Sequence, residues 1–131
     1  EPYRRQRQMC IRDSYNDQYS HATGDQVLKF VARTIKGTVN EFGFAGRYGG
    51  DEFIACIRNA EINDPTRAAQ DIISKLEEGF ECDGVHLTVS VSIGISMIKD
   101  DYNTRVEYII GKADEAMYSV KKNGKSNYAF I

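Results

Sequence analysis

Apolar residues recur along the chain with two different periods, which predict helices and strands in alternation. Helical spacing of apolar residues predicts three helices, over residues 21–40, 65–79 and 105–122. Alternation of apolar and polar residues predicts a long strand over residues 86–98. Short apolar runs predict further strands at residues 44–48, 53–58 and 126–131. The first two of these runs are joined by Gly49-Gly50-Asp51, which is typical of a hairpin turn.

This order of elements predicts an α+β fold, with a mostly antiparallel central sheet flanked by helices. Local signals support the helix ends. Asp64 followed by Pro65 is typical of a helix start, and Gly124 of a helix end. For the first helix, either Thr23 or Asp25 has the side chain of an N-cap.

The first fourteen residues show neither period. Residues 4–14 resemble translated sequencing-adapter read-through, and the alternative interpretation is a natural basic tail or linker. We therefore assign residues 1–14 to a prefix that looks foreign to the domain, and residues 15–131 to one domain. The fold requires a strand before the first helix, where the prefix lies, so we predict that the first strand is missing or replaced.

Composition narrows the class of protein. A chain of 131 residues with 41% hydrophobic and 27% charged residues has the size and balance of one soluble domain. A net charge of −2 argues against a nucleic-acid partner and against attachment to anionic membranes. No apolar run is long enough for a transmembrane helix. The three cysteines lack metal-ligand spacing, so a reducing cytoplasm is the expected compartment, although upstream regions could anchor a longer protein.

The predicted hairpin turn carries the clearest candidate chemistry. Gly49 and Gly50 have no Cβ atoms, so their N–H groups are able to face the oxygens of a phosphate. Asp51 and Glu52 follow directly, and a carboxylate suits Mg²⁺, which also binds phosphate oxygens. The alternative is an ordinary tight turn with a solvated acidic pair.

Four segments resemble the motifs of one family, in the family's order and at its separations. They are RYGGDEF at residues 47–53, NDQYSHATGD at 16–25, VSIGI at 91–95, and ADEAMYSVKKNGKSN at 113–127. Together they resemble the GGDEF domain, the bacterial signal-transduction module that makes the messenger cyclic di-GMP from two GTP molecules. The resemblance covers residues 15–131 and implies a fold like that of nucleotidyl cyclases and polymerase palms, with a ferredoxin-like core.

The resemblance also implies roles for individual residues. Asn16 and Asp25 would hydrogen-bond the guanine of GTP, because an amide and a carboxylate complement its edge. Gly49 and Gly50 would cradle phosphate, and Lys121 and Lys125 would contact the phosphates as point charges. Structural alternatives are a turn and N-cap for Asn16 and Asp25, and a cationic helix end for the lysines. Ser126 is one residue more than the family pattern has, so the register near Lys125 is less well defined.

For catalysis, the family implies Asp51 as ligand of Mg²⁺ or Mn²⁺, with Glu52 as a supporting carboxylate. Each of two facing domains holds one GTP, so a homodimer is the expected partner state, and a sensory or receiver domain is expected upstream. The VSIGI strand is interpreted as core, without chemistry.

Two departures from the family pattern change the expected activity. Family spacing, counted back from Asn16, puts Gln8 where a D-x-D/N-x-F-K segment has its first metal-binding Asp. We therefore predict a catalytically impaired chain. The positions of the family's inhibitory R-x-x-D product site are held by Asn40 and Gly43, so we predict no product inhibition by that route.

Two other hypotheses remain beside a diguanylate cyclase domain. A degenerate GGDEF module could bind GTP and regulate an attached or partner phosphodiesterase, which Gln8 favours if it is native. An unrelated nucleotidyl cyclase or polymerase-palm protein would also use carboxylates and metals, but RYGGDEF together with VSIGI argues against it.

Overall fold

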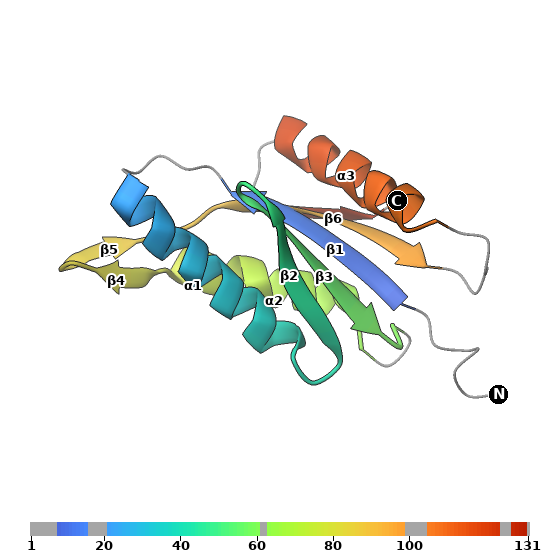
Figure 1. Cartoon of the computed structure of the whole chain (residues 1–131), viewed down its shortest axis with the longest axis horizontal. Coiled ribbons are helices and arrows are strands. Elements are labelled where there is room, and N and C mark those ends of the chain that lie inside the picture. The colour runs from blue at the N-terminus through green and yellow to red at the C-terminus, as the bar shows by residue number, and fades with distance from the viewer. Residues whose placement is uncertain (1–7, 16–20, 61–62, 99–104, 124–126, 131) are drawn as a thin grey trace.

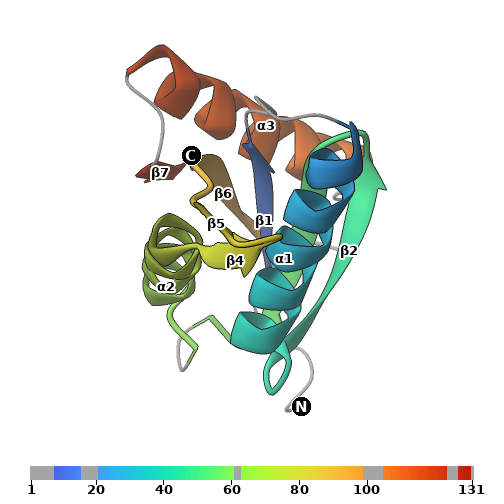
Figure 2. The ribbon, with the colours of Figure 1, turned by 90° about the vertical axis from the view of Figure 1, so that its left-hand side faces the viewer.

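A five-stranded sheet carries two helices on one face and one on the other (Figures 1 and 2). The computed structural model describes residues 8–15, 21–60, 63–98, 105–123 and 127–130. The helices are α1 (His21–Val39), α2 (Pro65–Glu78) and α3 (Val106–Lys122). The strands are β1 (Gln8–Tyr15), β2 (Gly43–Gly49), β3 (Glu52–Arg58), β4 (Phe80–Cys82), β5 (Val85–Leu87), β6 (Val91–Ile98) and β7 (Asn127–Phe130).

The large sheet has the strand order β2-β3-β1-β6-β7. Its first three strand pairs are antiparallel, and only the β6–β7 pair is parallel. The predicted α+β fold with a mostly antiparallel sheet is therefore confirmed. Within the described ranges, none of the helices is both long enough and apolar enough to span a bilayer.

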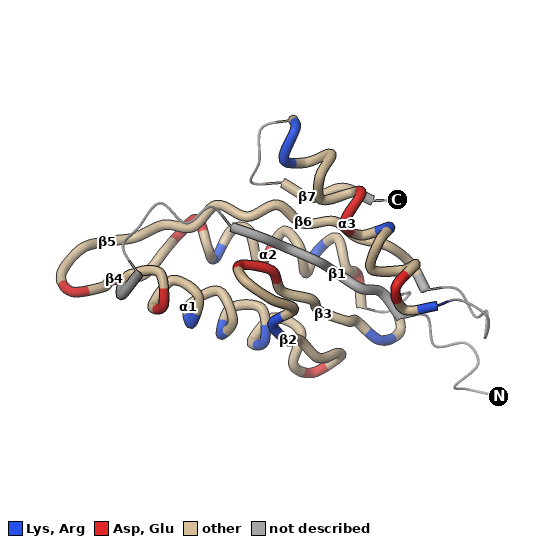
Figure 3. Tube along the Cα trace, turned by 45° about the horizontal axis from the view of Figure 1, so that its top comes forward, with Lys and Arg blue, Asp and Glu red and all other residues tan. Residues whose placement is uncertain are grey.

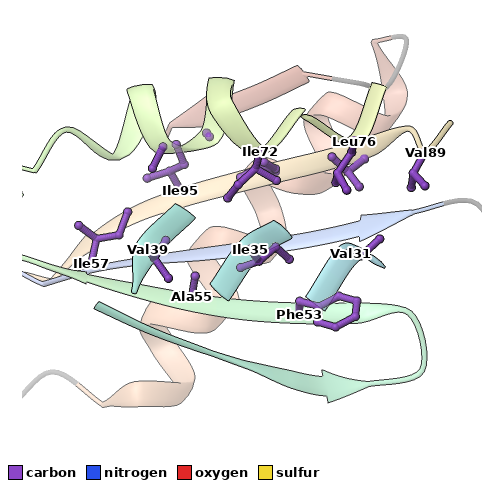
Figure 4. Packing of buried hydrophobic residues seen from close by; sticks show 14 of the residues in the cluster. Val31, Ile35, Val39, Phe53, Ala55, Ile57, Ile72, Leu76, Val89 and Ile95 are labelled. Atoms are coloured by element: carbon purple, nitrogen blue, oxygen red, sulfur yellow. The ribbon is translucent and has the colours of Figure 1, made fainter. Parts of the chain in front are cut away.

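The main core lies between the sheet and helices α1 and α2 (Figure 4). The alternating side chains of β3 and β6 that face these helices are almost fully buried, and so are the apolar stripes of both helices. These are Phe53, Ala55 and Ile57 of β3, Val91, Ile93 and Ile95 of β6, Val27, Val31, Ile35 and Val39 of α1, and Ala68, Ala69, Ile72 and Leu76 of α2. The stripe predicted for α1 is thus its buried face.

On the opposite face of the sheet, α3 packs very closely against β6. The close approach is possible because β6 presents Gly94 there, where a Cβ would lie 1.7 Å from the carbonyl oxygen of Ala113. The hydroxyl of Ser96 donates a 2.8 Å hydrogen bond to the carbonyl of Ile109, which satisfies this buried polar group. The VSIGI segment is therefore core, as predicted, and its small residues form the seat of α3.

Strand β1 lies in the middle of the sheet, between β3 and β6. It is formed by Gln8–Tyr15, most of which the sequence pattern had placed outside the domain. Residues 8–15 thus fill the backbone position of the first strand that the fold requires. Whether residues 1–14 are native to the protein stays a prediction.

The strand predicted over residues 86–98 is interrupted, so this prediction was wrong in its extent. Val85–Leu87 pairs with Phe80–Cys82 in a small hairpin of its own, and β6 starts only at Val91. Between them the N–H of Val89 donates to the carbonyl of Leu76 at the end of α2, at 2.9 Å. This bond to a helix explains why the sheet pairing stops there although the alternation continues.

The predicted cap of α2 is confirmed, and the predicted caps of α1 are not. Asp64 caps α2 as predicted, since its carboxylate accepts a hydrogen bond from the N–H of Thr66 at 2.9 Å. The proposed caps of α1 were wrong, because the helix starts at His21 and so includes both Thr23 and Asp25. Gly124, predicted to end α3, lies outside the described residues.

His86 in the β4–β5 hairpin should titrate above its ordinary pKa of 6.5. The first cause is its hydrogen bond to the carboxylate of Glu81 at 2.7 Å, and the second is its bond to the carbonyl of Glu78 at 2.8 Å. Both partners accept, so the imidazolium form is favoured because it donates from both ring nitrogens. Its contribution to stability should be complete below pH 6.5 and be lost as the pH rises through the folded-state pKa.

An NMR titration of the His86 ring tests this expectation. Glu81→Gln should lower the pKa of His86 toward its ordinary value, while Glu77→Gln, on the exposed side of α2, should leave it unchanged. An unchanged pKa in Glu81→Gln would show that the Glu81 contact does not act on the imidazole.

Candidate functional site

The acidic residues of the candidate site lie at the tip of the β2–β3 hairpin. Strand β2 ends at Gly49, and β3 starts at Glu52, which pairs with Gly49. Gly50 has a φ of +52°, in the left-handed region that favours glycine. Asp51 and Glu52 are both half-buried. The predicted hairpin is therefore confirmed, and its turn is built from the two glycines and the first carboxylate.

A hollow of about 440 Å³ separates this hairpin from α3. Glu52 lines it from the hairpin, and Asp114, Tyr118 and Lys121 line it from the helix. Lys121 is exposed in the last turn of α3, where the negative end of the helix dipole favours a cation. The structure thus brings two predicted site residues, Glu52 and Lys121, to one hollow.

A second hollow, of about 200 Å³, lies between α1 and β2. Its floor is apolar and includes Leu28, Ala45 and Phe53, and its cationic residues are Lys29, Lys36 and Arg47. Figure 3 shows basic residues following α1 beside β2, while acidic residues mark the hairpin tip. An apolar floor with cations suits a flat aromatic group that carries anionic substituents.

Asp25, predicted to bind guanine, is exposed on α1, one turn before Leu28 of this second hollow. Its predicted partner Asn16 lies outside the described residues, as does Lys125. The described part of the site is therefore Asp25, the hairpin tip from Gly49 to Glu52, and Lys121.

The sequence analysis missed the contact of the Arg47 side chain with the glycine turn. Its Nε and Nη2 atoms both donate to the carbonyl oxygen of Gly50, at 2.8 and 2.5 Å. The available signal was the position of an arginine just before two turn glycines, because a guanidinium reaches around a tight turn with several donors at once.

The expected place of Gln8 at the metal site is corrected by the strand register. Gln8 pairs with Arg58 and Ile98, at the end of the sheet away from the hairpin tip. The residue of β1 that pairs with Glu52 is Ser14, and the preceding residue, Asp13, pairs with Phe53. Counting along the family motif did not locate the residue beside Glu52, because β1 extends from Gln8 to Tyr15, further along the chain than the motif would place the first strand.

Asp51 and Glu52 are the hairpin residues whose chemistry suits Mg²⁺. In the part of the chain that the structure describes, no group of three or more His, Cys, Asp or Glu side chains is arranged to hold a metal ion. Mg²⁺ usually takes one or two carboxylates and completes its shell with water and phosphate oxygens. Asp51 and Glu52 therefore suit an ion that arrives with nucleotide phosphates.

The two positions of the family's inhibitory site lie at the far end of the hairpin from its tip. Asn40 is exposed after α1, and Gly43 begins β2. A Cβ at position 43 would lie 2.0 Å from the backbone carbonyl oxygen of Cys56. Gly43 therefore has a structural reason to lack a side chain.

An antiparallel α+β sheet whose hairpin tip carries carboxylates beside a helix-borne lysine defines a class of protein. It is the α+β class in which helices flank a mostly antiparallel sheet. Residues 13–127 match the family model described as diguanylate cyclase, GGDEF domain. The chain belongs to this family.

Curated proteins of the family resemble most of this chain. Diguanylate cyclase A of Treponema denticola is 38% identical over 112 residues, covering 85% of this chain and 30% of that protein. Signaling protein YkoW of Bacillus subtilis is 38% identical, covering 88% of this chain and 14% of YkoW. The bifunctional diguanylate cyclase/cyclic di-GMP phosphodiesterase MucR of Pseudomonas aeruginosa is 35% identical, covering 88% and 17%. The chain thus spans less than a third of each of these relatives.

Solved structures of the family share the fold. The GGDEF domain of PA1120 (YfiN or TpbB) from Pseudomonas aeruginosa superposes with a TM-score of 0.86 at 27% identity, covering 99% of this chain and 85% of that one. The active GGEEF domain of a diguanylate cyclase from Vibrio cholerae gives a TM-score of 0.82 at 26% identity, covering 98% and 85%. The family and the palm-like fold inferred from the motifs are therefore confirmed.

Proposed function

We propose that this domain is the catalytic part of a diguanylate cyclase, which condenses two GTP molecules into cyclic di-GMP and two molecules of pyrophosphate. The observation that carries the proposal is the half-buried pair Asp51 and Glu52 on a glycine turn, with Lys121 across the adjoining hollow. A metal-bound triphosphate needs carboxylates to hold the metal ion, N–H groups to bind phosphate oxygens, and a cation such as lysine to offset the phosphate charge.

GTP would bind along the hairpin. The guanine would be recognised by Asn16 and Asp25 and lie toward the apolar hollow of α1 and β2. The phosphates would lie over Gly49 and Gly50, where a Cβ would meet no atom within 4 Å and the turn therefore leaves room. Lys121 would neutralise phosphate charge from the α3 side, and Lys125 would do the same from the segment that follows α3.

Asp51 would hold Mg²⁺ or Mn²⁺, with Glu52 in support. When bound, the metal ion polarises the phosphate and offsets negative charge that develops during transfer. The chain's own residues keep the triphosphate in line for attack by the 3′-hydroxyl of a second GTP. That second GTP would be held by another copy of the domain, so catalysis requires a homodimer.

The proposed function also implies a compartment and a mode of control. The domain would act in the cytoplasm, under the control of a sensory or receiver domain elsewhere in a longer chain, with neither nucleic acid nor membrane as its ligand. Product inhibition through an R-x-x-D site is not expected, because Asn40 and Gly43 offer neither charge.

A specific observation favours a second candidate function. In the register of β1, Ser14 rather than a carboxylate is the residue that pairs with Glu52. A GGDEF module that binds GTP without efficient turnover could regulate a phosphodiesterase. The relative MucR carries both activities by its description, so a GGDEF domain and a phosphodiesterase do occur in one protein.

Asp51→Asn tests the proposed site. The parent chain should bind a non-hydrolysable GTP analogue more tightly with Mg²⁺ than with EDTA, and Asp51→Asn should lose about tenfold or more of the Mg²⁺-dependent gain, because the amide is a poor ligand. Isothermal titration calorimetry measures both. Asp71→Asn, an exposed substitution on α2, is the matched control and should bind like the parent. Equal binding with and without Mg²⁺ in the parent would refute the metal–phosphate site.

A further inference from the structure

The side chain of Arg47 is hydrogen-bonded to the glycine turn of the hairpin. Both Nε and Nη2 of Arg47 donate to the carbonyl oxygen of Gly50, at 2.8 and 2.5 Å. The pairing of β2 with β3 shifts register between Arg47 and Gly49, so the ladder is irregular at this point. The guanidinium thus adds a link to the turn next to the point where the ladder is irregular.

The turn needs such a link because its glycines do not restrain it. A Cβ at Gly49 or Gly50 would have no atom within 4 Å, so neighbouring atoms do not restrain either position sterically. Glycine also has the widest backbone freedom of the residues, which raises the entropy lost when one conformation is required. A phosphate cradle works best when its N–H groups are already aimed, because ordering them upon binding weakens affinity.

The contact with Arg47 also sets the direction of the next N–H group. In a trans peptide the C=O of Gly50 and the N–H of Asp51 point in opposite directions. Arg47 pairs with the buried Phe53 and lines the hollow between α1 and β2, so it approaches the turn from the α1 side. A Gly50 carbonyl held toward that side directs the Asp51 N–H away from it, toward the side on which Glu52 and Lys121 line their hollow.

We infer that Arg47 is a positioning residue for nucleotide binding: it orients the Gly50–Asp51 peptide so that the Asp51 N–H meets a phosphate oxygen of GTP. The same contact occupies a carbonyl oxygen that would otherwise repel the phosphate. This role acts on the phosphates through the Gly50–Asp51 peptide and not through a contact of Arg47 with them. This inference rests on the proposed function, and it adds a role for the residue that precedes the glycine turn.

Arg47→Lys is the decisive substitution, because lysine keeps the charge but lacks the guanidinium fork that gives two donors in a fixed geometry. Calorimetry with a non-hydrolysable GTP analogue and Mg²⁺ should show about tenfold weaker binding. Binding of guanosine, which has no phosphate, should weaken far less, because lysine keeps a cation beside the hollow between α1 and β2. Arg33→Lys, an exposed arginine of α1, is the matched control and should bind both ligands like the parent.

A spectroscopic readout separates positioning from general destabilisation. In the parent, the ¹⁵N–¹H resonance of Asp51 should shift strongly when the Mg²⁺–GTP analogue is added. In Arg47→Lys this shift should shrink, while the resonances of the buried residues Ile72 and Ile93 stay at their parent positions. A parent that binds no nucleotide would refute the proposed function itself. A parent that binds, with Arg47→Lys equal to it in affinity and in the Asp51 shift, would refute the positioning role alone.

Discussion

Replacing Gly94 by alanine should destabilise the domain by about 3 kcal/mol or more, at the upper end of what overpacking a core costs. The added Cβ would lie 1.7 Å from the carbonyl oxygen of Ala113 and 2.5 Å from the backbone nitrogen of Met117. Both atoms belong to the backbone of α3, so a change of side-chain rotamer cannot relieve the overlap. The helix has to move away from β6. The midpoint of urea unfolding, with an unchanged slope, measures the loss.

Gly37→Ala is the matched control within the same fold. Gly37 is exposed on α1, and a Cβ there would have no atom within 4 Å. Alanine should therefore stabilise the protein by about 0.5–1 kcal/mol, because glycine in a helix interior loses more backbone entropy on folding. Opposite signs for the two glycines are expected, and a Gly94→Ala protein as stable as the parent would show that α3 is not seated as closely as described.

The seat of α3 matters for the candidate site as well as for stability. Gly94 contacts the helix at Ala113 and Met117, and Lys121 follows one turn later. A shift of α3 away from β6 would move Lys121 relative to Glu52 across their hollow. Partly folded Gly94→Ala protein should accordingly bind the triphosphate more weakly than the parent.

The helices were predictable from sequence because each has one face that must be buried. The stripe from Val27 to Val39 is hydrophobic at helical spacing, and the structure buries it against β3 and β6. The hairpin was also predictable, since two glycines and an aspartate offer little but a turn between two apolar runs. These are local signals, and the fold follows them closely.

Register and long-range pairing were not predictable in the same way. Nothing in the residues of β1 states which of them will face Glu52, because that depends on two neighbouring strands distant in sequence. The β4–β5 hairpin did carry a local signal that was overlooked. Asp83 and Gly84 both have positive φ, as an Asp-Gly turn between short strands prefers.

The candidate site was predicted in part for the same reason. Its residue types could be recognised from motifs, and the structure brings Glu52 and Lys121 to one hollow. The contact of Arg47 with Gly50 requires a side chain to fold back over a turn, which no spacing rule describes. The residue of β1 that lies beside Glu52 depends on strand register. Counting along the motif gave Gln8 for the position of the metal-binding Asp, whereas the sheet pairs Ser14 with Glu52.

Restoring a family-like first strand should raise the rate of pyrophosphate release from GTP on the order of a hundredfold or more, because a second carboxylate on the metals contributes several kcal/mol to charge stabilisation. The test variant changes residues 8–13 to the pattern D-x-D-x-F-K, with Gln8→Asp as its first change, and makes residues 3–7 apolar. The upstream change is needed because Gln8 now pairs with Arg58, so the strand must slide to bring position 8 to the hairpin tip. This shift would bring residues 3–7 into buried positions of the sheet, where only apolar side chains are tolerated.

The matched control is the same variant with Gln8→Asn in place of Gln8→Asp, which has the same shape and spacing but no charge. It should stay near the rate of the parent chain, and so should Asp13→Asn in the parent, because Asp13 pairs with Phe53 rather than Glu52. Ser14→Asp in the unchanged strand separates the two ways of locating the metal partner. If it alone restores turnover, register governs, and if only the rebuilt strand does, motif spacing governs. A parent chain that turns over GTP as fast as the rebuilt one would refute the predicted impairment and leave Asp51 and Glu52 as a sufficient acidic site.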